Sequence, residues 1–122
     1  MERNDENTTV SYLKEQVKKF CEERDWDQFH DPKDLAIVIS TEANELLDIF
    51  RFKNDKDMQE ILKDQLKREH VGEELAYVFY FTLRFAQMNN FDLTSELLKK
   101  LAKNAQRYLI EKSKGSNKKY KF

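Results

Sequence analysis

Three glutamates lie at helical spacing inside apolar stretches of the sequence, Glu42 and Glu45 in one stretch and Glu74 in the next. Residues three apart on a helix share a face, so Glu42 and Glu45 can direct two carboxylates at one point. Glu74 can bring a third carboxylate from a neighbouring helix. Oxygen ligands suit a hard divalent cation, of which Mg2+ is the obvious candidate and Mn2+ a possible substitute. The spacing therefore predicts a magnesium site suited to phosphate chemistry.

The surroundings of these glutamates favour a metal site over a solvated helix face. Glu42 and Glu45 lie within an apolar run from residue 35 to 50, and burying a carboxylate without a cation or a hydrogen-bonding partner is costly. A di-iron bundle, the main competing metal centre, uses Glu-x-x-His pairs. Neither His30 nor His70 has a glutamate three residues before it. The sequence therefore disfavours iron.

Two further groups of residues admit both a structural and a binding role. Trp26, Phe29 and His30 lie between two helical stretches, where aromatic residues often fill a core but can also stack on a nucleotide base. His30 could then hydrogen-bond to a sugar or a phosphate. Asn104 and Tyr108 form an i, i+4 pair on the last predicted helix. From the residues alone, that pair is most simply the end of an amphipathic helix.

Composition indicates one all-α domain. The chain has 122 residues with only two glycines and one proline, which favours helices joined by short connections. Its formal net charge is −1 although 37% of its residues are charged, so no overall field would recruit nucleic acid or an anionic membrane. Cys21 is the single cysteine, and we expect it to be a buried free thiol in a reducing compartment.

The apolar periodicity predicts a bundle of about four to five helices. The first is capped near Thr8 or Thr9, the second runs from about 32 to 51 behind the cap Asp31, and another runs from about 68 or 72 to 89. Residues 53 to 70 are expected to form a short surface helix or a mobile connection, and Asp92 is expected to cap the last helix. The second helix and the helix ending at 89 are apolar nearly all round, which predicts completion of the bundle by subunit association.

The ends of the chain are polar. The N-terminal residues have no apolar core of the kind found in signal peptides, and no segment reaches the ~20 apolar residues of a membrane span. We therefore expect a cytoplasmic protein without a membrane partner. The polar residues 1–7 are expected to be flexible, and residues 112–122 to form a basic tail.

Four ordered segments resemble the MazG-like all-α nucleoside triphosphate pyrophosphohydrolases, most closely the dCTP pyrophosphatase branch. The resemblance runs from about residue 10 to the tail, with residues 8–111 forming the MazG-like domain. It implies that Glu42, Glu45 and Glu74 are metal-binding and catalytic. The residues that it implies for substrate binding come from four parts of the chain: Trp26, Asp27, Gln28, Phe29, His30, Phe52, Phe81, Asn104 and Tyr108. The segments that carry it are Glu23-Arg-Asp-Trp-Asp-Gln-Phe-His-Asp-Pro-Lys-Asp-Leu35, Glu42-Ala-Asn-Glu-Leu-Leu-Asp-Ile-Phe-Arg-Phe52, Glu73-Glu-Leu-Ala76 and Lys103-Asn-Ala-Gln-Arg-Tyr108.

The same resemblance implies an activity and an assembly. The activity is Mg2+-dependent hydrolysis of a dCTP-type nucleoside triphosphate to the monophosphate and pyrophosphate, which cleans the nucleotide pool, and the assembly is a homodimer or homotetramer. Tyr77 stands where the family carries the aspartate of Glu-x-x-Asp, and helical spacing places it on the face of Glu74 and Phe81. A phenol is a poor ligand for magnesium. The alternative interpretation is therefore a nucleotide-binding homologue with weakened or lost catalysis.

Overall fold

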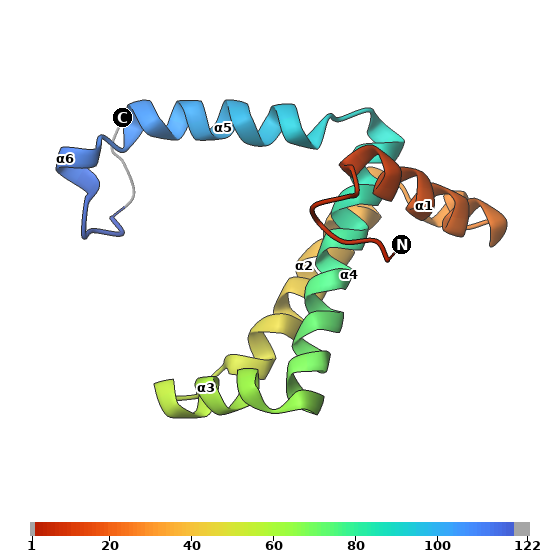
Figure 1. Ribbon diagram of the computed structural model, residues 1–122. Helices are drawn as coiled ribbons and strands as arrows, with labels where there is room; N and C mark the ends of the chain where they lie inside the picture. The colour runs from red at the N-terminus through yellow and green to blue at the C-terminus, as the bar shows by residue number, and fades with distance from the viewer. Residues whose placement is uncertain (1, 119–122) are drawn as a thin grey trace. The chain divides into compact units, whose positions relative to one another are not determined.

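The computed structural model describes residues 2–118 and is helical throughout its regular structure, with no strand among those residues. The all-α prediction is confirmed. The described part of the chain contains six α-helices and one short 3-10 helix, labelled in Figure 1 apart from η1: α1 Val10–Glu23, η1 Asp27–Phe29, α2 Pro32–Phe50, α3 Asp55–Lys63, α4 Gln65–Asn89, α5 Leu93–Arg107 and α6 Ile110–Ser113.

Side-chain caps explain where the helices begin. The Thr9 hydroxyl accepts a hydrogen bond from the backbone N–H of Tyr12 at 3.0 Å, and a carboxylate oxygen of Asp31 accepts one from Asp34 at 2.7 Å, directly before Pro32. Asp92 caps α5 in the same way. Such caps satisfy backbone donors that have no partner within the helix. The predicted caps at Thr9, Asp31 and Asp92 are therefore confirmed.

The central helix α4 is longer than the sequence led us to expect. Asp64 both ends α3 and caps α4, because its side chain accepts from the backbone N–H of Lys67 at 3.0 Å. The charged residues from 65 to 70 therefore belong to α4, and the predicted start at about 68 or 72 was wrong. Residues 53 to 70 contain α3 and the first turns of α4. The alternative that this region is a mobile connection is therefore also wrong.

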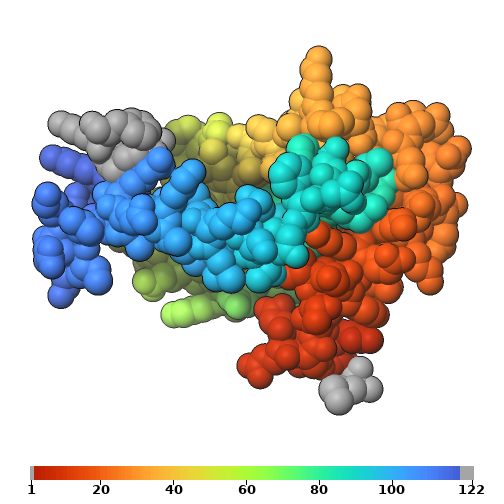
Figure 2. Space-filling view, turned by 90° about the horizontal axis from the view of Figure 1, so that it is seen from above, coloured from red at the N-terminus to blue at the C-terminus, as the bar shows by residue number. Residues whose placement is uncertain are grey.

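The chain divides into two compact units, residues 1–90 and residues 91–122. In the first unit, α2 lies alongside α4, and α1 and α3 also pack on α4 (Figure 1). Figure 2 shows α1, in red, against the turquoise C-terminal end of α4. The small core of this unit consists of the buried side chains of Cys21, Leu35, Ile61, Leu83 and Ala86.

Helices α2 and α4 carry apolar residues that stay exposed in a single chain. We had expected both helices to be covered on several sides. On α2, Ile37 and Leu47 are 48% and 50% exposed, and on α4, Leu75 and Phe79 are 57% and 46% exposed. These side chains lie outside the small core. The predicted subunit association would cover them, and it stays a prediction.

The second unit contains α5 and α6. The leucines of α5 at 97, 98 and 101 are exposed within the chain. The predicted basic tail over 112–122 begins inside α6, and its residues 119–122 lie outside the described residues. The predicted boundaries at 7, 8, 111 and 112 stay predictions. None of the helices in the part described has the length and apolar character needed to cross a membrane.

Candidate functional site

Glu42 of α2 and Glu74 of α4 lie together in the packed interface between these helices, and we call them the carboxylate pair. Burial raises the pKa of Glu42, and the hydrogen bond to Glu74 and the negative charges of Glu74 and Glu45 raise it further. A hydrogen bond between two carboxyl groups requires that one of them is protonated. The pair is therefore a place where carboxyl groups crowd together and Glu42 ionises less readily than an isolated glutamate.

One oxygen of the carboxylate pair has no partner. Oε2 of Glu74 is buried and makes no hydrogen bond with any described residue. A buried acceptor left without a donor costs free energy. This unsatisfied oxygen and the raised pKa of Glu42 both fit a site that is completed by a cation.

The structure brings two of the three predicted ligands into direct contact. Glu45 is exposed on α2, one helical turn from Glu42, and acts on it through its charge. Within residues 2–118, no group of three histidine, cysteine or acidic residues is close enough to hold a metal ion. The oxygen-only donor set fits a hard divalent cation such as Mg2+, and the roles of Glu42, Glu45 and Glu74 as ligands stay a prediction.

An open cavity of about 620 Å³ lies between α1, the segment around η1, and α4, and we call it the aromatic cavity. Its wall is predominantly apolar, with the polar tips of a few side chains. This combination is typical of sites that take a flat ring with a polar edge. The lining residues are Gln16, Val17, Phe20, Trp26, His30, Tyr77, Tyr80 and Phe81.

The rings of the aromatic cavity support one another. Trp26 packs edge to face against Phe20, with centroids 5.7 Å apart, and against His30 at 6.5 Å. On α4, Tyr77 stacks on Phe81 with centroids 6.0 Å apart and ring planes 14° apart. Three residues that were predicted to bind substrate, Trp26, His30 and Phe81, therefore lie together in one cavity.

The expectation that Tyr77 shares a helix face with Phe81 is confirmed. The ring of Tyr77 lines the aromatic cavity and packs on Phe81 and Tyr80. The stacking of successive aromatic residues along α4 explains this orientation, because an i, i+4 pair shares one face of the helix. Tyr77 thus widens the aromatic surface instead of joining the carboxylate pair.

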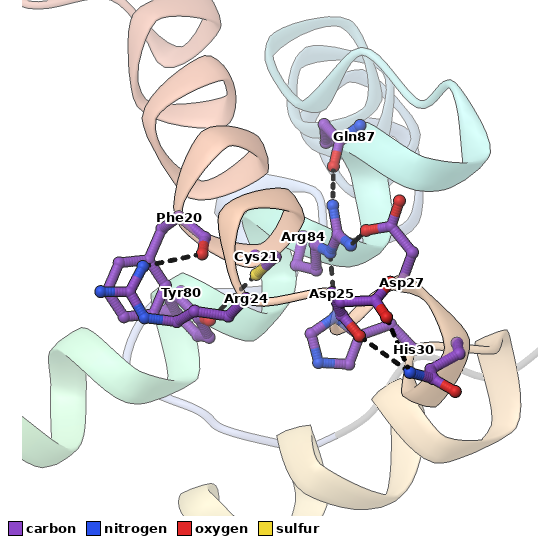
Figure 3. Close-up of polar contacts among 10 residues, drawn as sticks. Phe20, Cys21, Arg24, Asp25, Asp27, His30, Tyr80, Arg84 and Gln87 are labelled. Atoms are coloured by element: carbon purple, nitrogen blue, oxygen red, sulfur yellow. Dashed lines mark hydrogen bonds and ion pairs between the residues drawn. The ribbon is translucent and has the colours of Figure 1, made fainter.

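Arg84 contacts His30 of the cavity lining and is only 1% exposed. Its guanidinium donates to a carboxylate oxygen of Asp27, to Nδ1 of His30 at 3.0 Å and to Oε1 of Gln87 at 2.6 Å (Figure 3). A buried cation needs such partners, because desolvation would otherwise destabilise it. Asp27, expected to contact substrate, instead forms an ion pair with Arg84. Arg84 was not among the residues predicted from the sequence, although it is the single charge between Tyr80 and Ala86.

Burial and the contact with Arg84 both favour the neutral form of His30. Burial lowers the pKa of His30 and the positive charge of Arg84 lowers it further, whereas Asp27 acts in the opposite direction. At neutral pH the imidazole is therefore uncharged. A neutral imidazole has one donor and one acceptor nitrogen.

The remaining predicted substrate residues of the first unit do not line the aromatic cavity. Gln28 donates to the backbone oxygen and side chain of Asp25, and Phe29 is 61% exposed. Phe52 follows α2 with a left-handed φ of 65° and is 97% exposed. Asn104 and Tyr108 belong to the second unit. The backbone N–H of Tyr108 donates a hydrogen bond to the backbone oxygen of Asn104 at the end of α5. Substrate contact by these residues stays a prediction.

The expected burial of Cys21 is confirmed. Its sulfur lies 3.1 Å from the hydroxyl oxygen of Tyr80, a residue of the cavity lining (Figure 3). Burial raises the pKa of Tyr80, and the contact with Cys21 adds to that effect. The phenol is therefore protonated at neutral pH, and it joins α1 to α4.

The arrangement of the helices and their site matches a known class of protein. A model of the MazG-like family matches residues 37–121, and the chain belongs to that family. It is similar to dCTP pyrophosphatase 1 of rat, with 31% identity over 112 residues, and of human, with 30%. These alignments cover 92% of this chain and 66% of the relatives, so the chain spans just under two thirds of their length. Among solved structures, it is similar to a pyrophosphatase from Archaeoglobus fulgidus, with a TM-score of 0.77 and 27% identity over 88% of this chain and 99% of that one.

Proposed function

We propose that the protein is a nucleoside triphosphate pyrophosphohydrolase that converts a dCTP-type nucleotide and water to the monophosphate and pyrophosphate. The observation that carries this proposal is the order of residues along α4. Glu74 of the carboxylate pair lies one helical turn, about 5 Å of helix, before Tyr77 in the wall of the aromatic cavity. A nucleotide has the same order of parts, with anionic phosphates joined through a sugar to a flat base.

The two regions would divide the recognition of the nucleotide. The rings of Trp26, Tyr77 and Phe81 offer stacking surfaces to the base. Glu42 and Glu74, with Glu45 one turn away, would hold Mg2+, and the bound cation would offset phosphate charge and make the attacking water more acidic. A carboxylate of this group is the candidate acceptor for the proton of that water.

The same proposal includes a subunit assembly and a location. A homodimer or homotetramer would cover the exposed apolar residues of α2 and α4, because burial of apolar surface drives association. A cytoplasmic protein would meet both nucleoside triphosphates and Mg2+. The names of the relatives, dCTP pyrophosphatase 1 and a pyrophosphatase, support the choice of substrate and reaction.

The test is a screen of deoxynucleoside and nucleoside triphosphates for pyrophosphate release, with Mg2+, with Mn2+ and with a chelator. We expect release from dCTP with a divalent cation and none with the chelator. Release of orthophosphate instead of pyrophosphate, or no release from any triphosphate, would contradict the proposal.

A second candidate function is nucleotide binding without appreciable catalysis. It is favoured by the position of Tyr77, which leaves only two carboxylates in direct contact where the family's motif has a further aspartate. In that case dCTP with Mg2+ would raise the melting temperature of the protein, but no pyrophosphate would form. The same screen therefore separates the two functions.

A further inference from the structure

His30, which lines the aromatic cavity, is hydrogen-bonded to the buried guanidinium of Arg84. Arg84 Nε donates a hydrogen bond to Nδ1 of His30 at 3.0 Å. A nitrogen that accepts a hydrogen bond carries a lone pair and no proton, so the neutral ring must carry its proton on Nε2. The opposite tautomer would place two N–H donors against each other.

The guanidinium is itself fixed. Besides His30, it donates to Asp27 and to Gln87, from the next turn of α4 (Figure 3). With a side chain that is 1% exposed, it has no water layer in which to rearrange. A planar guanidinium held by three partners has few alternative orientations. Arg84 therefore fixes both the position and the tautomer of the imidazole.

His30 keeps a second ring nitrogen, Nε2, that Arg84 does not engage. The imidazole lines the aromatic cavity and packs on Trp26, and Nε2 lies on the far side of the ring from the nitrogen that meets Arg84. No described residue hydrogen-bonds to Nε2. In a wall that is mostly apolar, one fixed donor has a large effect on which ligands fit, because a polar group without a partner is costly there.

We propose that Arg84 is a positioning residue that holds His30 as the Nε2–H tautomer, so that the imidazole donates a hydrogen bond to an acceptor on the base of a bound nucleotide. This inference rests on the proposed function, which it deepens by naming the group that reads the edge of the base. The acceptor is a carbonyl oxygen or an unprotonated ring nitrogen. The lowered pKa of His30 agrees with a ring that stays neutral during binding.

The first experiment needs no nucleotide. The chain has two histidines, so the variant His70→Asn leaves one imidazole, and 15N NMR of labelled protein reports which of its nitrogens carries the proton. His70 is exposed and does not line the aromatic cavity. We expect a single Nε2–H tautomer at neutral pH. A proton on Nδ1, or an averaged mixture of tautomers in folded protein, would overturn the inference.

The second experiment removes the guanidinium. In the same background, Arg84→Met keeps much of the side-chain volume, and we expect a mixture of tautomers and about tenfold weaker binding of dCMP, the loss of one good hydrogen bond. Unchanged tautomer and unchanged affinity would overturn the inference. If this variant does not fold, Asp27→Asn loosens the same guanidinium from a half-exposed position and should shift both readouts in the same direction.

The two experiments separate this inference from the proposed function. A wild-type protein that binds dCMP but shows mixed tautomers would overturn the inference alone. A protein that shows the Nε2–H tautomer but binds neither dCMP nor dCTP would contradict the proposed function together with the donor role of His30, although the positioning by Arg84 would stand.

Discussion

The aromatic cavity and the carboxylate pair lie along the same helix and differ in how complete they are. The cavity is built by one chain: its rings pack on each other, His30 accepts a hydrogen bond from Arg84, and the hydroxyl of Tyr80 contacts the sulfur of Cys21. The carboxylate pair instead carries a buried oxygen without a partner and a raised pKa. A site that is unsatisfied when empty gains more from its ligand. This difference supports the proposal that the base binds a preformed surface and that the phosphates bind a site that a cation completes.

The largest effect is expected at the carboxylate pair. Glu42→Gln, Glu45→Gln or Glu74→Gln should each lower Mg2+-dependent pyrophosphate release by about 100-fold or more, because each removes charge from one cation site. In metal-free buffer, Glu42→Gln should unfold at an equal or higher temperature, since it removes charge repulsion. Both quantities are measured by activity assays and thermal melts with and without Mg2+.

The exposed neighbour Glu73 provides the matched control, because Glu73→Gln removes the same charge from the adjacent position of α4. We expect nearly wild-type activity from it. Equal losses in Glu73→Gln and Glu74→Gln, or Mg2+ dependence that persists in all three site variants, would remove the carboxylate pair from the mechanism.

The next effect concerns Trp26, the only tryptophan. If it stacks on the base, Trp26→Ala should weaken dCMP binding by about tenfold or more, since a base–aromatic contact contributes roughly 1–3 kcal/mol. Its fluorescence should also change on titration with dCMP and Mg2+. Phe79→Leu is the control, because Phe79 is an exposed aromatic residue that does not line the cavity. Silent fluorescence together with unchanged affinity in Trp26→Ala would place the base elsewhere.

Tyr77 lies between the aromatic cavity and the carboxylate pair along α4. Its replacement by aspartate should therefore weaken nucleotide binding and strengthen Mg2+ binding. Tyr77→Asp removes a ring stacked on Phe81 and should weaken dCMP binding several-fold, since such a ring pair contributes about 0.5–1.5 kcal/mol. It also adds a carboxylate one turn from Glu74 and should increase the Mg2+-induced rise in melting temperature. Tyr77→Phe keeps the ring and should change neither. A Tyr77→Asp variant with tighter dCMP binding and no gain in Mg2+ stabilisation would reverse this assignment.

A smaller effect is expected from the pH dependence of stability. The folded pKa of His30 is below its ordinary value of 6.5, so the unfolded chain binds more protons over the interval between the two values. The free energy of unfolding should therefore decrease as pH falls through 6.5 and level off below the folded pKa. Urea titrations of wild type and His30→Asn across this interval should show a weaker pH slope in the variant. Identical slopes would mean that His30 keeps its ordinary pKa in the folded protein.

The smallest effect lies outside both regions, at Gly72 in α4. A Cβ built there meets nothing within 4 Å, and glycine within a helix is less favourable than alanine by about 0.5–1 kcal/mol. Gly72→Ala should raise the free energy of unfolding by that amount, as measured by urea denaturation. Gly115→Ala is the contrasting control, because its φ of 79° is strained for a residue with a side chain. A destabilised Gly72→Ala variant would mean that another surface approaches this position.

The sequence predicted the fold better than it predicted the site. Caps such as Asp31 and Asp92 act on neighbouring backbone groups, so their positions could be read directly from the chain. The start of α4 could not, because Asp64 performs two roles that a local pattern does not separate. In the site, helical spacing placed Tyr77 on the face of Phe81, but the contact between Glu42 and Glu74 joins two helices and depends on how these helices pack. Arg84 was missed because its partners Asp27 and His30 are more than fifty residues away in the sequence.

The contact between Cys21 and Tyr80 couples the cavity to the motion of α1. The fully buried Cys21 anchors α1 on α4, and α1 also carries Gln16, Val17 and Phe20 of the cavity wall. When the end of α1 separates from α4 in a local opening, one whole side of the cavity leaves with it. Local openings of this kind set the rate of amide hydrogen exchange. A ligand in the cavity should therefore slow exchange along the last turns of α1, including amides that it does not touch.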